Sequence, residues 1–270
     1  MANSFNNLLF LLGFVAIFGQ AMASSRRLSP SPSPNPIDVE KIDTTWYDGR
    51  ATFYGDFRGG ETMKGACGYG NLFQQGYGLA TAALSTALFN DGGACGACFE
   101  IMCVNNEHNW CIPNAGTIKI TATNFCPPDY TKTQDIWCNP PQRHFDLSLY
   151  MFTKMAPYRA GVIPVRYRRT RCHKLGGIRF ELKGNPYWLL VLPYNVGGAG
   201  DVIDVQIKGS STGWLQMKRN WGQNWEVGSY LVGQSLSFRV TTSDWKTKEF
   251  DNVVPSSWEF GQNFVGKYNF

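Results

Sequence analysis

The sequence has no apolar run long enough to cross a membrane as a helix. The longest, "LLFLLGFVAIF" at residues 8–18, is well short of the roughly 20 residues that a bilayer requires. It is followed by Ala21-Met22-Ala23, the small-x-small pattern of a cleavage site. We therefore predict a signal peptide over residues 1–23, a secreted protein and no transmembrane segment.

The chain also lacks a dense basic patch. Its net charge of +5 is spread along 270 residues, and the densest cluster, "RYRRTR" at 166–171, has the alternation of a strand with a solvated face. Nucleic-acid recognition requires a concentrated positive surface, so we exclude nucleic acid as a partner. A mild positive charge instead suits adhesion to an acidic matrix such as pectin.

Cysteine is absent after Cys172, and all 8 cysteines lie between Cys67 and that residue. An even number in an exported chain indicates a disulfide framework. Cys95 and Cys98 form a C-x-x-C pair, a spacing that zinc sites also use. Neither a second such pair nor two histidines at ligand spacing accompany it, so we expect no metal and no cofactor.

Residues 24–45 form a Ser/Pro-rich lead-in, which we expect to be extended because proline fixes φ and removes backbone donors. The first folded domain is predicted over 46–177, with its core at about 64–177. Short strands between glycine-rich turns favour a small closed β-barrel there. The strands expected in this domain are 51–54, 99–104, 117–124 and 162–169.

The strand at 117–124 is predicted from alternation, since Ile118 and Ile120 are separated by Lys119 and Thr121, which should face solvent. Two other segments favour helices. Residues 80–89 are rich in Ala and Leu without a breaker, and 147–155 follow Asp146, a residue suited to capping a helix N-terminus.

The second domain is predicted over 187–266. Short runs rich in β-branched and aromatic residues, separated by Gly, Asn and Ser, favour a β-sandwich. Without cysteine this domain depends on its hydrophobic core, and its length is sufficient for one. Most of its tryptophans are therefore expected in that core.

Six motifs closely resemble those of the plant alpha-expansins. They are "GACGYGNL" (65–72), "GGACGACFEIMC" (92–103), "TATNFCPPDY" (121–130), "CNPPQRHFDLS" (138–148), "YRAGVIPVRYRR" (158–169) and "NVGGAGDVIDVQIKG" (195–209). The resemblance runs without a break from about residue 50 to the end. It is highly specific, because the motifs are long and occur in the same order.

The resemblance implies an all-β protein of two domains: a six-stranded double-psi β-barrel, similar to family-45 glycoside hydrolases, followed by an immunoglobulin-like β-sandwich that binds cellulose. It implies location in the plant cell wall, with peripheral attachment to the membrane left open. It further implies acid-dependent wall loosening, in which noncovalent contacts between cellulose and matrix glucans of the xyloglucan type are disrupted without hydrolysis. We expect a monomer whose partners are those polysaccharides.

A cysteine pairing is implied by the same resemblance. Sequence alone does not select among the many pairings that eight cysteines allow. By position in the family's pattern, the bridges would be Cys67–Cys95, Cys98–Cys172, Cys103–Cys111 and Cys126–Cys138.

The segment "HFD" at 144–146 matches a family motif whose aspartate is the general acid in the related hydrolases. Hydrolysis also requires a second carboxylate, roughly 6.5–9.5 Å away in inverting enzymes. The first strand, which supplies that base in the hydrolases, here has Thr52 and Tyr54, whose hydroxyls are poor bases at acid pH. We therefore expect a polysaccharide groove without a catalytic pair, formed by Thr52, Tyr54, Asn124, His144 and Asp146.

The roles expected of the other polar residues in and around this groove differ. Asn124 stands where some relatives carry aspartate, although the register could place Ala122 there, and its amide cannot take a proton. Asp48 and Asp56 flank the first strand and are expected in turns. For His144 a structural role is favoured over a catalytic one.

An aromatic platform is expected in the second domain. Trp221 and Trp225 flank a turn-like Gly-Gln-Asn, so at least one of them should be exposed. Exposed flat rings match the apolar face of a β-1,4-glucan. Together with the resemblance, this predicts a polysaccharide platform of Tyr187, Trp188 and Trp221.

Two alternative functions stay open at this point. The chain could be a weak endo-β-1,4-glucanase, because loss of a general base alone costs about 10²–10⁴-fold in rate. It could also be a plain cellulose-binding module, which would bind cellulose without extending a wall.

Overall fold

The computed structural model describes residues 42–59, 64–105, 109–134 and 136–270, which belong to one compact unit. The predicted signal peptide and most of the Ser/Pro lead-in lie outside the described residues. No helix in the described ranges has the length and apolar character needed to span a bilayer. The limits assigned above to the two domains stay a prediction.

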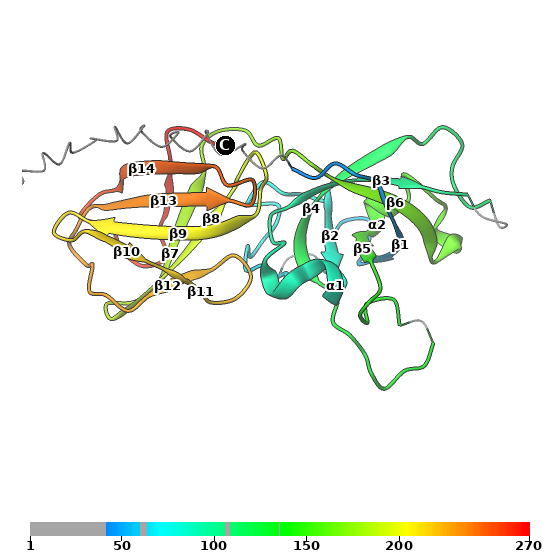
Figure 1. Cartoon of the computed structure of the whole chain (residues 1–270), viewed down its shortest axis with the longest axis horizontal. Helices are drawn as coiled ribbons and strands as arrows, with labels where there is room; N and C mark the ends of the chain where they lie inside the picture. The colour runs from blue at the N-terminus through cyan, green and yellow to red at the C-terminus, as the bar shows by residue number, and fades with distance from the viewer. Residues whose placement is uncertain (1–41, 60–63, 106–108, 135) are drawn as a thin grey trace, which may run out of the picture. The chain divides into compact units, whose positions relative to one another are not determined.

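Within these residues the first half of the chain forms a closed β-barrel, confirming the expected architecture (Figure 1). Its strands are β1 (Tyr47–Tyr54), β2 (Thr81–Leu84), β3 (Cys98–Cys103), β4 (Thr117–Phe125), β5 (His144–Ser148) and β6 (Ile163–Thr170). Around the ring they follow the order β1-β5-β2-β4-β3-β6, with β1 parallel to β5 and β2 parallel to β4. This order brings residues far apart in sequence side by side.

The strand predicted at 117–124 is present as β4, but it has only a partly solvated outer face. Ile118 and Ile120 are buried as expected and Lys119 is exposed. Thr121 is buried, contrary to the alternation, because the ammonium of Lys174 lies 3.2 Å from its hydroxyl and covers it. The chain that follows the barrel therefore packs on the outside of β4.

The predicted helix at 80–89 is wrong over its first half. Its residues instead form β2, followed by the short helix α1 (Thr86–Phe89) and a 3-10 turn (Asn90–Gly92). All four residues of β2 are buried, because the strand pairs with β4 on one side and β5 on the other. Closing the ring thus outweighs the helix preference of Ala and Leu, which is weak per residue.

Asp146 does not cap a helix, so that prediction is also wrong. It lies in the middle of β5, and the helix α2 (Leu149–Phe152) begins only after Ser148. The Ser148 hydroxyl accepts a hydrogen bond from the Met151 N–H at 3.3 Å and is the N-cap. A second 3-10 turn (Tyr158–Ala160) leads into β6. The carboxylate of Asp146 is therefore not used to cap α2.

The second half of the chain forms two packed sheets, as predicted for a sandwich. One has the order β10-β9-β13-β14 and the other β11-β12-β8-β7-β15. The strands are β7 (Arg179–Asn185), β8 (Trp188–Tyr194), β9 (Val202–Gly209), β10 (Trp214–Gln216), β11 (Lys218–Arg219), β12 (Trp225–Val227), β13 (Leu236–Thr242), β14 (Thr247–Val254) and β15 (Asn263–Val265). β7 lies in residues 178–186, which fall between the two predicted domain ranges.

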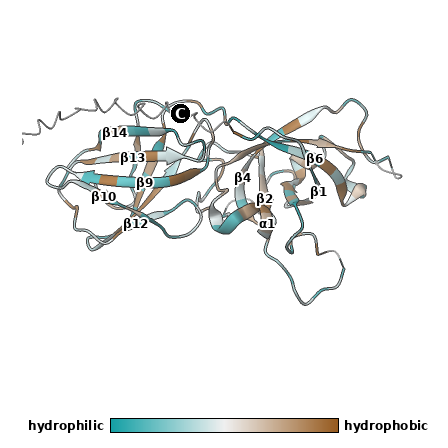
Figure 2. Ribbon diagram, in the orientation of Figure 1, coloured by the Kyte–Doolittle hydropathy of each residue, from teal (hydrophilic) through white to brown (hydrophobic). Residues whose placement is uncertain are grey.

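Aliphatic and phenylalanine side chains, rather than tryptophan, fill most of the sandwich core. The rings of Phe180 and Phe238 stack across the two sheets with centroids 4.3 Å apart. Figure 2 shows brown apolar segments interrupted by teal polar ones along these strands. Only Trp225 and Trp258 of the tryptophans in this half are buried, so the expectation that most would be core residues is wrong.

The four disulfides have the pairing that the resemblance implies. They are Cys67–Cys95, Cys98–Cys172, Cys103–Cys111 and Cys126–Cys138. Each closes a loop of the barrel half, and Cys98–Cys172 also ties the start of β3 to the segment that leads into the sandwich. The cysteine-free sandwich is therefore covalently anchored near its first strand.

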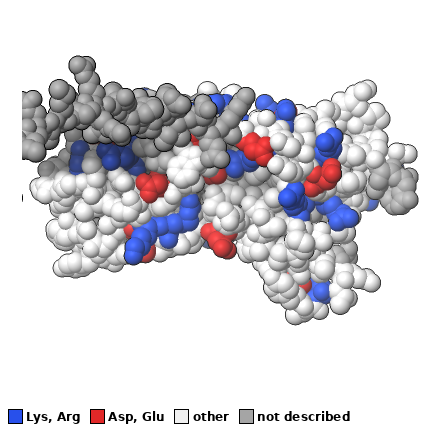
Figure 3. All heavy atoms as spheres, in the orientation of Figure 1, with Lys and Arg blue, Asp and Glu red and all other residues white. Residues whose placement is uncertain are grey.

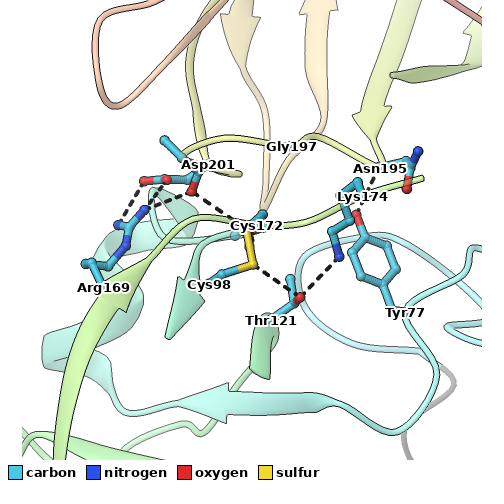
Figure 4. Close-up of a disulfide and its surroundings, with 12 residues drawn as sticks. Tyr77, Cys98, Thr121, Arg169, Cys172, Lys174, Asn195, Gly197 and Asp201 are labelled. Carbon is cyan, nitrogen blue, oxygen red and sulfur yellow. Dashed lines mark hydrogen bonds and ion pairs between the residues drawn. A yellow bond between two sulfur atoms is a disulfide. The ribbon is translucent and has the colours of Figure 1, made fainter. Parts of the chain in front are cut away.

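A buried ion pair joins the two halves beside this disulfide (Figure 4). The Arg169 guanidinium, on β6, contacts the Asp201 carboxylate at 2.5 Å and donates to the Ala199 carbonyl at 3.0 Å. Asp201 is almost fully buried and also accepts a hydrogen bond from the Ser243 hydroxyl at 2.9 Å. By contrast, basic and acidic side chains are scattered and solvated on the face drawn in Figure 3.

Removing the Asp201 carboxylate should destabilise the protein because Arg169 would remain as a partly buried, unpaired charge. We expect Asp201→Ala to lower the free energy of unfolding by roughly 3 kcal/mol. The double variant Arg169→Met/Asp201→Leu should lose less, since it leaves no unpaired charge. Denaturant titration of both with disulfides intact measures the difference, and equal losses would contradict the explanation.

Candidate functional site

The centre of the expected groove lies where β1 and β5 run side by side. Their register sets Thr52 opposite Asp146 and Arg50 opposite His144. The Thr52 hydroxyl donates to Asp146 Oδ1 at 2.7 Å, and its oxygen lies 2.8 Å from His144 Nε2. The three side chains therefore form one hydrogen-bonded row across two strands.

The direction of the hydrogen bonds in this row determines which ring nitrogen of His144 carries the proton. Because Thr52 gives its single proton to Asp146, its oxygen must accept, so the proton of neutral His144 sits on Nε2. The ring is buried, and its Nδ1 has no partner among the described residues. Trp137 lies alongside it at 6.5 Å and carries the Arg50 guanidinium at 4.7 Å on its ring. His144 is thus held as a positioning residue for Thr52.

Burial shifts the two titrating groups of the row in opposite directions. It raises the pKa of Asp146, and the hydrogen bond from Thr52 only partly opposes the rise. Burial, with the positive charge of Arg50, lowers the pKa of His144 to about 4. Mild acid therefore favours a row that carries no net charge, with a protonated carboxyl and a neutral imidazole.

Tyr54 and Asn124 lie beyond this row and have structural as well as surface roles. Burial and the charge of Asp146 raise the pKa of Tyr54 to about 12, so its hydroxyl stays protonated. Asn124 pairs with β2 at the end of β4, and its Oδ1 accepts from the N–H groups of Ala66 and Phe125, both at 2.8 Å. Asn124 therefore fixes the turn that precedes Cys67.

One further carboxylate adjoins the row, and sequence analysis missed it. Asp129 lines a cavity of about 230 Å³ together with Thr52, His144 and Trp137. Hydrogen bonds from Thr131 lower the pKa of Asp129, and Lys132 lies 3.3 Å from its carboxylate. Because its carboxylate contacts Lys132 and accepts two hydrogen bonds from Thr131, Asp129 is a weak base at acid pH.

The two acids that flank β1 are not placed as a pair for Asp146. Asp56 follows the strand in a turn, where its Oδ1 accepts from the Arg58 N–H at 2.8 Å. Asp48 lies within β1 rather than in a turn, so that expectation is wrong, and its exposed carboxylate is 3.6 Å from the Arg166 guanidinium. Asp135 lies outside the described residues.

No group of three or more His, Cys, Asp and Glu side chains in the described ranges is arranged to hold a metal ion.

The platform residues lie on one edge region of the five-stranded sheet. Tyr187, in the turn before β8, is 78% exposed, while Trp188 and Trp221 are 37% and 48% exposed. Glu226 links the two tryptophans, since it accepts from Trp188 Nε1 at 3.1 Å and also from the side chain of Asn220. Asn220 immediately precedes Trp221, so the backbone that carries Trp221 is held near the carboxylate that binds the Trp188 indole.

Tyr230 is a fourth exposed ring at this place, and sequence analysis did not select it. It is 58% exposed, and its centroid lies 6.0 Å from that of Tyr187 at an interplanar angle of 50°. Its position two residues after Gly228, next to a Gly-Ser pair typical of turns, was the available signal. Trp225, the other tryptophan flanking the 222–224 turn, is buried beneath the Arg219 guanidinium.

The loop that bears Trp221 is fixed to the barrel turn that Asn124 holds. The Gln223 N–H donates to the Cys67 carbonyl and its side chain to the Cys95 carbonyl, both at 3.0 Å. Gly222, with φ +52°, lies so close that a Cβ would be 2.6 Å from the Cys67 Cα. Groove and platform are therefore connected through the Cys67–Cys95 disulfide.

Two family profiles match the chain. A profile described as "Expansin C-terminal domain" covers residues 178–255, and one described as "Lytic transglycolase" covers 81–167. Among curated proteins, Expansin-A23 of Arabidopsis thaliana is 58% identical over 99% of the chain and 100% of its own length. Expansin-A22 of the same plant is 68% identical over 96% of the chain and 91% of its own length. The chain belongs to the alpha-expansin family.

Alpha-expansins are cell-wall proteins that loosen the wall without enzymatic activity, and this alpha-expansin is a wall-loosening protein of that kind. Its fold is also that of a solved bacterial expansin. The expansin of Clavibacter michiganensis matches with a TM-score of 0.64 at 19% identity, over 83% of this chain and 98% of that chain. At this identity the likeness concerns the fold alone.

Replacing His144 should make folding less sensitive to acid. In the wild type, His144 has a lower pKa in the folded than in the unfolded state, so its contribution to stability is lost as pH falls from about 6.5 to about 4. We expect the stability of His144→Gln to change less over this window, by up to about 3 kcal/mol. Denaturant titrations across the window test this, and parallel profiles for both proteins would contradict it.

Proposed function

We propose that this alpha-expansin is secreted through its signal peptide and acts as a monomer on cellulose and xyloglucan-like matrix glucans. It grips a glucan strand in the barrel groove, docks on cellulose through the aromatic platform, and disrupts the noncovalent contacts between them. The observation that carries the proposal is the partner of Asp146, which is the hydroxyl of Thr52 rather than a second carboxylate. A hydroxyl cannot serve as the base of an inverting pair at acid pH.

The acid dependence of wall loosening follows from the same row. A glucan carries no charge, and binding it against an ionised, partly buried carboxylate leaves that charge without its water. Protonation of Asp146 removes this cost, and His144 is still largely neutral in mild acid. Acid thus makes the centre of the groove compatible with a neutral polymer.

Docking on cellulose is supported by the exposed rings of Tyr187, Trp188 and Trp221, which present apolar faces to solvent. A variant of the Clavibacter michiganensis expansin has been crystallised in complex with cellohexaose. We extend glucan binding to this chain on the strength of its own exposed rings, with that complex as a parallel.

For the alternative of a weak endoglucanase, Asp129 is the candidate base, because it lines the cavity beside Thr52 and His144. Its carboxylate is engaged by Lys132 and Thr131, which lowers its pKa and its strength as a base. The alternative of a plain binding module predicts cellulose binding without any extension of a wall.

Asp146→Asn tests the role assigned to protonation. The amide is uncharged at every pH, so we expect creep of a clamped, heat-killed wall strip to lose most of its dependence on pH between about 4 and about 7. The wild type should creep only in acid. Asp48→Asn, which removes an exposed carboxylate from the neighbouring strand β1, is the matched control and should keep the wild-type profile.

Reducing ends and polymer chain length are measured in the same strips, because hydrolysis of a glycosidic bond shortens the chain and releases one reducing end. Creep without either change supports the proposal. Chain shortening that disappears in Asp146→Asn or Asp129→Asn would establish the endoglucanase alternative. Loss of creep at every pH in a folded Asp146→Asn protein would refute the role of charge removal.

The platform is tested by cellulose binding. Tyr187→Ala and Trp221→Ala should each lose stacking worth about 1 kcal/mol, which is a roughly fivefold weaker partition onto cellulose. Trp245→Ala removes an equally exposed tryptophan from the β13–β14 turn of the other sheet and should bind as the wild type does. Equal losses in all three variants would show that exposed aromatics act without a defined platform.

A further inference from the structure

A cavity of about 510 Å³ lies against the outer face of β4, away from the row of Asp146, Thr52 and His144. Its walls come from three segments: the outer side of β4, the turn at 75–77, and the chain at 170–175 that leads from the barrel into β7. Its size is within the range of cavities that hold small ligands. Nothing in the proposed glucan grip uses it.

The charge of this cavity has one sign. Its titratable wall residues include Lys119, Arg171, His173, Lys174 and Arg179, and no Asp or Glu is among the described residues that line it. None of the five forms an ion pair within the described part of the chain. Concentrated, unneutralised positive charge in a concave site attracts anions.

The acid nearest to this cluster is engaged elsewhere. Glu100 pairs with Lys119 across β3 and β4, but its carboxylate lies 2.7 Å from the Arg168 guanidinium and accepts from the Thr117 hydroxyl at 2.8 Å. The positive charge of Lys119 is therefore not neutralised by a dedicated partner.

Lys174 is the most constrained of these five side chains (Figure 4). Its ammonium donates to the Thr121 hydroxyl at 3.2 Å and lies 4.4 Å from the centre of the Tyr77 ring. Burial lowers its pKa to about 8, so it is still charged in a wall of acid pH. An ammonium has three donors, and a bound anion would relieve part of the cost of burying it.

A second buried donor lines the same cavity. The Nε of Arg179 is buried and has no hydrogen-bond partner among the described residues. Such a group costs free energy unless something satisfies it. Arg171 and His173, by contrast, are exposed at the cavity and have no side-chain partner in the described chain, so they are available to a ligand.

The remaining wall residues indicate the class of anion. Gln75, Thr121 and Thr170 supply an amide and two hydroxyls, which are the groups that bind sugar hydroxyls. The cavity is larger than a bare inorganic anion needs, and it is a hollow rather than the extended basic stripe typical of nucleic-acid binding. Together these features favour an anion that also carries hydroxyl groups.

We propose that this cavity binds a uronate, the carboxylated sugar unit of an acidic matrix polysaccharide. The carboxylate contacts the cluster of Lys119, Arg171 and Lys174, and the ring hydroxyls bond to the neighbouring threonine and glutamine side chains. The uronate can come from a galacturonan or from glucuronate side groups on a xylan. This site is independent of the proposed glucan grip and adds a tether to the charged part of the wall.

The test is calorimetric titration of the full-length secreted protein with de-esterified trigalacturonate and with a glucuronate-bearing xylo-oligosaccharide. We expect at least one of them to bind, with an affinity that falls as salt is raised. The methyl ester of trigalacturonate, which lacks the charge, should bind at least about tenfold more weakly. Creep and cellulose binding are not part of this readout, so its failure is distinguishable from failure of the proposed function.

Lys119→Gln/Arg171→Gln changes two exposed residues and should weaken uronate binding about tenfold or more while leaving cellulose binding unchanged. Its matched control is Lys154→Gln/Arg159→Gln, which makes the same change in net charge at two exposed residues that do not line the cavity. The control should bind as the wild type does. Equal weakening in both pairs, or no binding of either acidic probe by the wild type, would overturn the proposal.

Discussion

Barrel and sandwich approach each other backbone to backbone, and this closeness requires glycine at two places. A Cβ on Gly200 would lie 2.3 Å from the Gly96 carbonyl oxygen and 2.4 Å from the Cys172 sulfur. A Cβ on Gly222 would meet the Cys67 backbone at 2.6 Å. Both glycines also have positive φ, where other residues are strained. Every feature that spans the two halves depends on these contacts, from the Arg169–Asp201 ion pair to the fixed position of the Trp221 loop.

The molecule carries two kinds of proposed binding surface, one centred on Asp146 and one on the basic cavity. On one side, the row through Asp146 becomes uncharged in acid, which suits a neutral glucan. On the other, the segment that carries Cys172 to the sandwich brings Arg171 and Lys174 onto the outside of β4, where positive charge is not neutralised. Two disulfides organise these surfaces: Cys67–Cys95 ties together the turns that hold the Trp221 loop, and Cys98–Cys172 fixes the segment that lines the basic cavity.

The features predictable from the sequence were those set by local pattern or by the family's motifs. Alternation located β4, short β-branched and aromatic runs predicted the sandwich, and the family's motifs implied the disulfide pairing that the structure has. Residues 81–84 were misjudged because Ala and Leu favour helix, whereas ring closure imposes a strand. The exposure of Trp245 and the clustering of Lys119 with Arg171 and Lys174 could not be predicted, because both depend on which strands pack together.

Asp146 has a hydroxyl rather than a second acid as its partner, and this determines which hydrogen bonds its carboxyl group can make. Its Oδ1 accepts from Thr52, so the proton taken up in acid belongs on the other oxygen. An ionised carboxylate only accepts hydrogen bonds, whereas a protonated one also donates. The ring and glycosidic oxygens of a glucan only accept, so Asp146 offers them a partner only when it is protonated. We infer that acid replaces a charge that would lose its water with a hydrogen-bond donor. The Thr52 hydroxyl preserves this exchange, whereas a carboxylate at position 52 would have competed for the proton.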